Sequence, residues 1–283
     1  MSFDRSRLFY LLCFVIAGST VVAIAKDLPA SASSTVLTAE VRKSARERLR
    51  PYFERQHVEF PPKNLRIVAT KQERRLKLFA PDHTGEWRFI LQYPIAAASG
   101  TSGPKLCEGD EQVPEGIYRV NSLNPHSKFH LSLELNYPNE FDRRQARADG
   151  RKLPLGRDIM IHGKWWSIGC IALGDTAAED VYVLVSDTGL NNVRVVLAPM
   201  DLRELPPGKT PPLDVVTSQP AWVPALHDDL RRELTLLKDA GLSTTSLLVS
   251  YRDSIPPPQV TAAQAAAALV LELIQWLGAT PKE

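Results

Sequence analysis

A histidine and a cysteine stand eight positions apart, each next to a short apolar segment. His162 follows the apolar run 159–161, and Cys170 precedes a second run at 171–173. Short apolar runs of this kind are typical of buried strands. A thiol with a pKa of roughly 8.5 needs a base to become a nucleophile, and an imidazole at about 3 Å can take its proton or hold the thiolate as an ion pair. The pattern therefore predicts a cysteine nucleophile with a histidine partner, and acyl transfer through a thioester.

Two glycines and a serine accompany this pair. Gly169 lets the backbone turn tightly before Cys170, so we expect the N–H groups of that turn to face a developing oxyanion. We expect Gly163, which follows His162, to contact the substrate. Ser167 is expected either to orient the histidine or to line the pocket.

A structural role for both the cysteine and the histidine stays open, because a free cysteine often behaves as a small buried hydrophobe. A zinc site is not expected. Only one cysteine lies in this stretch, no C-x-x-C pair occurs, and the other histidines are scattered along the chain. We therefore expect neither a metal ion nor a cofactor.

The motif His162-Gly163, followed after a spacer by Ser167-x-Gly169-Cys170, resembles the signature of the L,D-transpeptidase catalytic domain of the YkuD type. That signature is His-Gly, a spacer and then Ser/Thr-His-Gly-Cys. The resemblance covers roughly residues 65–199, and its motifs occur in the family's order. Three upstream segments resemble one branch of the family: Gly103-Pro104-Lys105-Leu106, Glu108-Gly109-Asp110-x-Gln112-x-Pro114-Glu115-Gly116-x-Tyr118 and Asn136-Tyr137-Pro138-Asn139-x-Phe141-Asp142-Arg143.

The chain departs from the family signature in two ways. Its spacer is short, and Ile168 stands where the family has a second histidine. His162 is therefore the only local candidate for the base. Both departures resemble the branch that includes proteins detaching a lipoprotein from peptidoglycan.

The resemblance implies a mainly β domain of the α+β class, a β-sandwich with flanking helices, followed here by a helical C-terminal appendage. It also implies that Cys170 attacks the stem peptide of peptidoglycan, at the bond between meso-diaminopimelate and the terminal D-alanine. An amine would then resolve the thioester. The expected partners are peptidoglycan stem peptides.

Two alternatives to a transpeptidase stay open. A hydrolase would use water to release a covalently bound lipoprotein from peptidoglycan, and its partners would include that lipoprotein. An inactive wall-binding module is the non-enzyme alternative, which Ile168 favours and the pair of His162 and Cys170 opposes. A thiol-directed acylating probe such as a carbapenem distinguishes an enzyme from an inactive module.

Three side chains are candidates for substrate contact. The stretch 136–156 is polar and rich in arginine, and we expect a loop there. Arg143 within it suits the free carboxylates of a stem peptide, with a merely solvated arginine as the alternative. Trp165 and Trp166 fill the spacer, and we expect one indole to cover the cleft and the other to be buried.

Composition and the first residues indicate an exported globular protein. The 283 residues are 44% hydrophobic and 23% charged, and the net charge of +2 gives no electrostatic case for nucleic acid. Two arginines precede an apolar run at 8–24, and Ala23 and Ala25 fit a signal peptidase site. We expect a signal peptide at 1–25 and a periplasmic protein. The alternative is an uncleaved segment that anchors the chain to the inner membrane.

Removing this segment leaves two cysteines, Cys107 and Cys170. An exported protein usually pairs its cysteines, but a disulfide here would disable the nucleophile. A buried, inert Cys107 and a redox-reversible bond to Cys170 both stay open. His126 and His130 lie off the signature and are expected to be structural.

Composition shifts divide the chain into segments. After the signal peptide, a leader at 26–62 contains an amphipathic helix at 38–54 with a basic face that we expect to be solvated. A catalytic domain at 63–200 is followed by a Pro-rich linker at 201–224 and a helical region at 225–283. Strands are expected at 65–69, 75–79, 87–93, 116–120, 129–135 and 193–197, a helix with Asp175 as its N-cap, and two late helices at 222–238 and 260–277.

Overall fold

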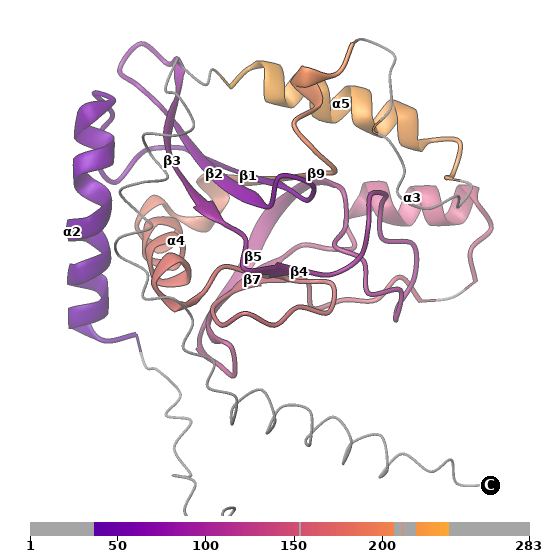
Figure 1. Ribbon diagram of the computed structural model, residues 1–283, viewed down its shortest axis with the longest axis horizontal. Helices are drawn as coiled ribbons and strands as arrows, with labels where there is room; N and C mark the ends of the chain where they lie inside the picture. Colours follow the sequence, from indigo (N-terminus) through magenta and orange to yellow (C-terminus); the bar gives the residue numbers. More distant parts are fainter. Residues whose placement is uncertain (1–36, 153, 207–210, 212–218, 238–283) are drawn as a thin grey trace, which may run out of the picture.

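The computed structural model describes residues 37–152, 154–206, 211 and 219–237 (Figure 1). The signal peptide, the parts 207–210 and 212–218 of the linker and the late helix at 260–277 lie outside the described residues, and the division of the chain into segments stays a prediction. Among the described helices, none combines the length and the apolarity that a membrane span requires.

In the described part of the chain, nine strands form one continuous hydrogen-bonded order, β3-β2-β1-β9-β5-β6-β7-β8-β4. Helices flank this sheet, so the mainly β, α+β class predicted from the sequence is confirmed. The strands are β1 (Leu65–Thr70), β2 (Arg75–Pro81), β3 (Trp87–Pro94), β4 (Ala97–Ala98), β5 (Gly116–Ser127), β6 (His130–Leu135), β7 (Met160–His162), β8 (Ile171–Ala172) and β9 (Val193–Ala198). The helices are α2 (Ala39–Arg55), α3 (Glu140–Ala148), α4 (Asp175–Thr188) and α5 (Val223–Thr235), with short 3-10 turns at Leu190–Asn192 and Leu202–Glu204.

The long strand β5 joins two halves of the sheet. Its first residues pair with β9, and its later residues pair with β6. The pairing with β6 shifts between Val120 and Ser122, and such a bulge bends a strand and increases its twist. Side chains from both halves, such as Leu78 in β2 and Leu133 in β6, pack into one core. The antiparallel β1-β2-β3 meander is present as predicted, and β9 closes against β1 in parallel.

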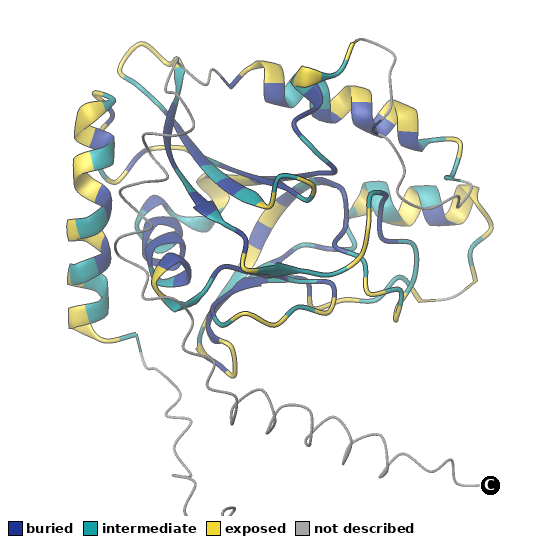
Figure 2. Cartoon of the chain, viewed as in Figure 1, coloured by how far each residue is buried: buried dark blue, intermediate teal, exposed yellow. Residues whose placement is uncertain are grey.

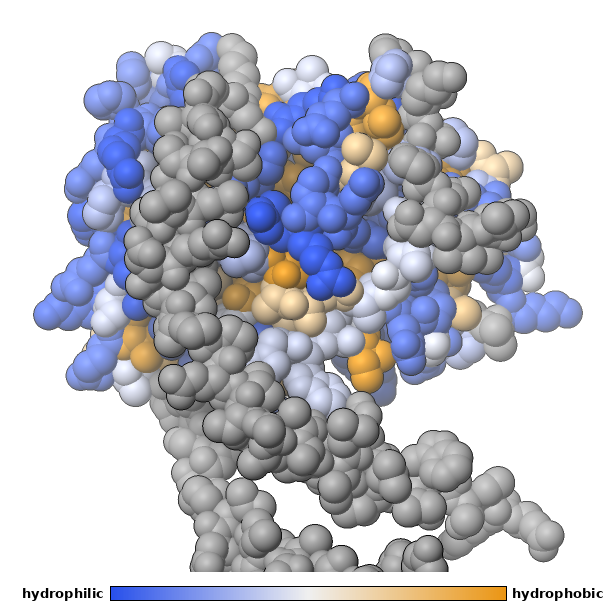
Figure 3. Space-filling model, viewed as in Figure 1, coloured by the Kyte–Doolittle hydropathy of each residue, from blue (hydrophilic) through white to orange (hydrophobic). Residues whose placement is uncertain are grey.

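Helices α2 and α4 lie side by side at one end of the core (Figure 1). Ala45, Leu49 and Phe53 are the buried face of α2. The basic face is only partly solvated, because Arg46 pairs with Asp187 of α4 at 2.7 Å. Figure 3 shows hydrophilic residues gathered over the outer side of α2, at the left of the view.

A buried ion pair reinforces this contact. Arg48 of α2 lies 2.7 Å from Asp180 of α4, and Tyr93 Oη donates to the same carboxylate at 3.0 Å. Burial raises the pKa of Asp180 to about 6, against the opposing effect of Arg48. The α2 helix is therefore fixed to α4 and the core by charge as well as by apolar packing.

Two predictions about helices were wrong. The stretch 136–156 is not only a loop, because it contains α3. Asn139 caps α3 by accepting from Asp142 N at 3.1 Å, and Asp142 returns the bond by accepting from Asn139 N at 2.8 Å. The N-cap of α4 is Gly174, whereas Asp175 is the first helical residue and accepts from the Lys164 backbone at 2.8 Å.

The helix α5 packs on the sheet face opposite to the main core. Leu226, Leu230 and Leu234 contact Val68 of β1 and Val196 of β9 within a second apolar cluster. Its other side is exposed, as the yellow segments in Figure 2 show. The helix α5 thus packs directly on the sheet.

Candidate active site

His162 and Cys170 are placed by two short parallel strands. Ile161 of β7 pairs with Ile171 of β8, and both side chains are buried in the core. Because side chains alternate along a strand, His162 and Cys170 lie on the opposite face, away from that core. Cys170 directly precedes β8, and its Sγ accepts a hydrogen bond from Met160 N at 3.4 Å. The structure therefore brings the two predicted residues to one face of the sheet.

The imidazole of His162 is almost completely buried, at 2% exposure. Its Nδ1 lies 2.6 Å from the carbonyl oxygen of Gly163. A carbonyl only accepts hydrogen bonds, so Nδ1 carries the hydrogen and Nε2 keeps a free lone pair. The ring of Phe129 packs against the imidazole, with 4.9 Å between ring centroids. Burial lowers the pKa of His162 below its usual 6.5, so the neutral base is favoured at neutral pH.

The thiol of Cys170 is also held in its neutral form. Burial raises the pKa of Cys170 above its usual 9.0, and the hydrogen bond from Met160 N only partly offsets this. The thiol donates to Asp158 O at 3.5 Å. Of the two possibilities open from the sequence, the geometry favours proton removal during attack over a preformed thiolate–imidazolium pair. Cys107 and Cys170 are both free thiols here.

Ser167 fixes the backbone of the nucleophile and does not orient the histidine. Its Oγ donates to the Cys170 carbonyl at 2.6 Å and accepts from Ser99 N at 3.2 Å. The prediction that the Gly169 amide faces an oxyanion is corrected as well. Gly169 N donates to Ser99 Oγ at 2.6 Å, so this amide is already occupied.

Ser99 is a site residue that sequence reasoning missed. It lies just after β4, and its Oγ donates in turn to Glu111 O at 2.7 Å. It thereby links the loop that carries the nucleophile to the loop that follows β4. The run of small polar residues after Ala98 indicated a loop, but nothing in it singled out Ser99.

The local backbone conformation and packing explain why positions 163 and 169 are glycines. Gly169 has φ +87°, a conformation that favours glycine before the nucleophile. A Cβ on Gly163 would lie 2.7 Å from both Asp175 Oδ1 and His130 Cβ. Gly163 therefore acts by close packing and through its carbonyl, and a contact with substrate stays a prediction.

The spacer presents an exposed apolar surface beside the nucleophile. Trp165 is 53% exposed, Trp166 is 46% exposed and Ile168 is 70% exposed. The expectation that one indole is buried is therefore wrong. The loop is only three residues long between Gly163 and Ser167, and Lys164 is tied to Asp175 by an ion pair at 2.8 Å. That short tether turns both indoles outward.

The contacts of Arg143, His130 and His126 within the described residues do not include the Cys170 thiol. Arg143 is exposed on α3 and lines a polar pocket of about 610 Å³. His130 Nε2 lies 3.0 Å from Glu179 Oε1, which fits the structural role expected of it. His126 is exposed, and its backbone N–H donates to Asn124.

Glu115, in the motif that precedes β5, connects two segments of the chain near the site. The carboxylate of Glu115 is buried and lies 3.1 Å from Lys71 Nζ and 3.0 Å from His227 Nε2. It also accepts from Gly103 N at 2.7 Å. Lys71 donates to Gly103 O at 2.7 Å as well. Glu115 therefore ties α5 to the loop that begins at Ser99.

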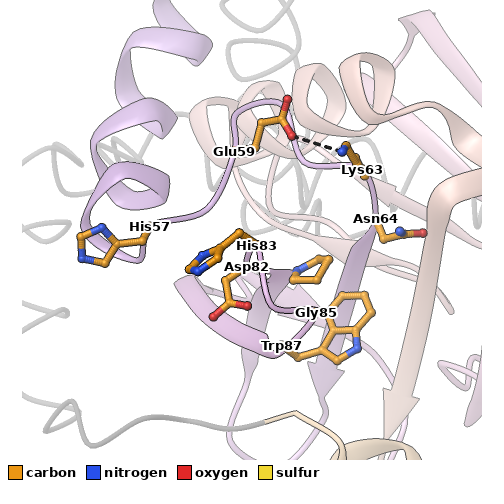
Figure 4. Close-up of a pocket in the computed structure, with 9 residues that line it drawn as sticks. His57, Glu59, Lys63, Asn64, Asp82, His83, Gly85 and Trp87 are labelled. Carbon is orange, nitrogen blue, oxygen red and sulfur yellow. Dashed lines mark ion pairs between the residues drawn. The ribbon is translucent and has the colours of Figure 1, made fainter.

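A second pocket, of about 740 Å³, lies between the end of α2 and the β2–β3 turn (Figure 4). His57, Asp82, His83 and Trp87 contribute to its lining, and none of the predicted site residues does. Within the described ranges, no group of three or more His, Cys, Asp or Glu side chains is arranged to hold a metal ion.

Comparison with known proteins finds a family that the described domain resembles. Residues 64–198 match the family model of the L,D-transpeptidase catalytic domain, YkuD. Over 144 residues the chain is 33% identical to the Escherichia coli K12 relative named "Putative L,D-transpeptidase YafK", an alignment that covers 49% of this chain and 55% of the relative. The chain thus spans about half the length of the curated relative it matches.

Solved structures show similar but distant folds. The helical cell shape determining protein Pgp2 from Campylobacter jejuni superposes with a TM-score of 0.40 at 24% identity, covering 48% of each chain. L,D-transpeptidase 1 of Mycobacterium tuberculosis gives a TM-score of 0.28 at 12% identity, covering 48% of this chain and 62% of that one.

Proposed function

We propose that this protein is a cysteine L,D-transpeptidase that modifies peptidoglycan outside the cytoplasmic membrane. The observation that carries the proposal is the placement of His162 and Cys170 on one sheet face, with the Nδ1 hydrogen of His162 fixed by Gly163 O at 2.6 Å. This arrangement leaves Nε2 as the base for a neutral thiol.

The proposed reaction has two stages. In the first, Cys170 Sγ attacks the diaminopimelate carbonyl of the stem peptide while His162 Nε2 takes the thiol proton. The tetrahedral oxyanion accepts a hydrogen bond from the Cys170 backbone N–H, since the amide of Gly169 is occupied by Ser99. The C–N bond then breaks, and the leaving D-alanine amine receives the proton from His162. A thioester on Cys170 remains.

In the second stage an acceptor amine attacks the thioester. His162 removes the proton from that amine, the C–S bond breaks, and the thiolate of Cys170 regains the proton. The products are a new amide bond and the free enzyme. The protein residues supply positioning and proton transfer throughout.

A hydrolase that releases a covalently bound lipoprotein is the second candidate. The short spacer and Ile168 favour it, because both depart from the family signature. It uses the same nucleophile and base, and water in place of the amine. An inactive wall-binding module is less well supported, because both His162 and Cys170 are present.

Mass spectrometry of reaction products tests these candidates. The full-length protein and Cys170→Ala are incubated with tetrapeptide muropeptides and, separately, with lipoprotein-linked muropeptides. Loss of D-alanine together with an amine-exchanged or cross-linked product, absent in the variant, supports the transpeptidase. Release of the attached peptide by water alone supports the hydrolase. If neither substrate changes in a Cys170-dependent way, the enzyme proposal is wrong.

A further inference from the structure

The polar pocket beside α3 has the charges of a site for a small zwitterion. Its cavity of about 610 Å³ is bounded by the outer faces of β5 and β6 and by α3. Two guanidinium groups, from Arg119 and Arg143, and the carboxylate of Glu134 contribute to the lining. The fourth charged group, Glu140, is already paired with Arg147 at 2.7 Å.

None of these three side chains forms an ion pair within the described residues, although the charge of Arg143 also acts on Glu140 and Asp142. Glu134 is nevertheless held in place, because its Oε2 accepts from Ser122 Oγ at 2.6 Å. Glu134, Arg119 and Arg143 thus bring one carboxylate and two guanidinium groups to the lining of one cavity.

The pocket residue Glu134 lies two strands away from Cys170, on the same face of the sheet. Glu134 of β6 pairs with Met160 of β7, and Met160 N donates to Cys170 Sγ at 3.4 Å. Side chains at such neighbouring positions project from the same face. Two strand spacings of about 4.8 Å each place Glu134 about 10 Å from Cys170. The pocket therefore lies within reach of a substrate whose carbonyl is at the thiol.

We propose that this pocket binds the zwitterionic end of an amino-acid side chain, a single carbon that carries both an ammonium and a carboxylate. Glu134 binds the ammonium, and Arg143, supported by Arg119, binds the carboxylate. The inference rests on the proposed function, because the diaminopimelate of a stem peptide ends its side chain in this group. An attack distance of about 3 Å, the five C–C bonds from the attacked carbonyl to the carbon that carries the ammonium, and a hydrogen bond of about 3 Å are together long enough to bridge about 10 Å.

The proposed site determines which stem peptides the enzyme accepts. A diaminopimelate residue with a free side-chain amine and a free carboxylate satisfies both charges. A lysine residue lacks the carboxylate, and a cross-linked or acylated diaminopimelate lacks the ammonium. The enzyme therefore selects stem peptides whose diaminopimelate end is unmodified.

The test compares three tetrapeptides with the full-length protein. One contains diaminopimelate, one contains diaminopimelate acetylated on its side-chain amine, and one contains lysine. Glu134→Gln and Arg143→Gln remove one charge each, and Arg144→Gln, on the same helix but outside the pocket lining, is the matched control. For the wild type, we expect KM to rise about tenfold with either altered peptide, as loss of one charged hydrogen bond predicts.

Each variant has its own expected pattern. Glu134→Gln loses the discrimination against the acetylated peptide, Arg143→Gln loses the discrimination against the lysine peptide, and Arg144→Gln discriminates like the wild type. If all variants turn over the diaminopimelate peptide with unchanged discrimination, the pocket proposal is overturned and the proposed function stands.

Binding to Cys170→Ala separates the two proposals further. If the wild type turns over no peptide but Cys170→Ala binds the diaminopimelate peptide with a preference that Glu134→Gln and Arg143→Gln abolish, the pocket proposal stands and the proposed function fails. Binding without that preference overturns the pocket proposal.

Discussion

The Nδ1 of His162 donates its hydrogen to the carbonyl oxygen of Gly163, the next residue in the chain, over 2.6 Å. This bond decides which ring nitrogen carries the proton, and so which nitrogen accepts one. Because the acceptor is a backbone carbonyl, the imidazole of His162 is oriented without a carboxylate side chain. The close packing of Gly163 against His130 and Asp175 holds that carbonyl in place.

Replacing the base tests this relationship. His162→Gln keeps a polar side chain but removes the base, and we expect acylation of Cys170 to slow by about 10²–10⁴-fold. The rate is measured by intact-protein mass spectrometry after mixing with an acylating substrate. Circular dichroism checks that the variant is folded. An unchanged rate in a folded variant would mean that another group removes the proton.

The acylation rate should depend on pH through the histidine. Burial lowers the pKa of His162 below 6.5, and the neutral ring is the active form. The rate is therefore expected to fall as the pH drops through the pKa of His162, with its midpoint below pH 6.5. Since the pKa of Cys170 is raised above 9.0, no thiolate forms in advance at neutral pH. A midpoint above pH 6.5 would contradict the neutral pair.

Ser99→Ala should weaken the loop that carries the nucleophile. The change removes the acceptor for Gly169 N and the donor to Glu111 O, each a hydrogen bond with a net value of about 1 kcal/mol. We expect acylation to slow about tenfold, with a small loss of stability. Ser102→Ala, on the same loop, is the control. Equal rates for the two variants would show that the Ser99 contacts do not position Cys170.

Glu115→Ala should destabilise the fold strongly. Burial alone would raise the pKa of Glu115, but hydrogen bonds from His227 and Gly103 and the charge of Lys71 lower it, so the carboxylate is ionised. Removing it leaves Lys71 buried without its partner, at a cost of about 3–5 kcal/mol. Urea denaturation measures the loss against Glu140→Ala, an exposed control. A loss below about 1 kcal/mol would mean that the network is not structural.

Much of the structure around His162 and Cys170 was predicted from the local sequence pattern. The apolar runs around His162 and Cys170 became adjacent strands because alternation and short apolar length are strong signals. The helix α3 was missed because its residues are mostly charged and its one buried side chain is Ala146. The sequence feature that indicates α3 is the capping pair of Asn139 and Asp142. These two residues lie within a motif that was interpreted only as a resemblance to the family.

Other features of the site depend on contacts between distant segments. Ser99 reaches Gly169 across 70 positions of sequence, and no local pattern records that contact. The alignment of Glu134 with Cys170 depends on strand register, which the sequence determines only through the whole sheet. The exposure of both Trp165 and Trp166 follows from the tether of Lys164 to Asp175.

Mass spectrometry of the intact protein after exposure to a carbapenem tests the central claim most directly. The account predicts one covalent adduct on Cys170 in the wild type, none on Cys107, and no adduct in Cys170→Ala. An absence of labelling in the folded wild type, or an adduct on Cys107 that persists in Cys170→Ala, would contradict the assignment of Cys170 as the nucleophile.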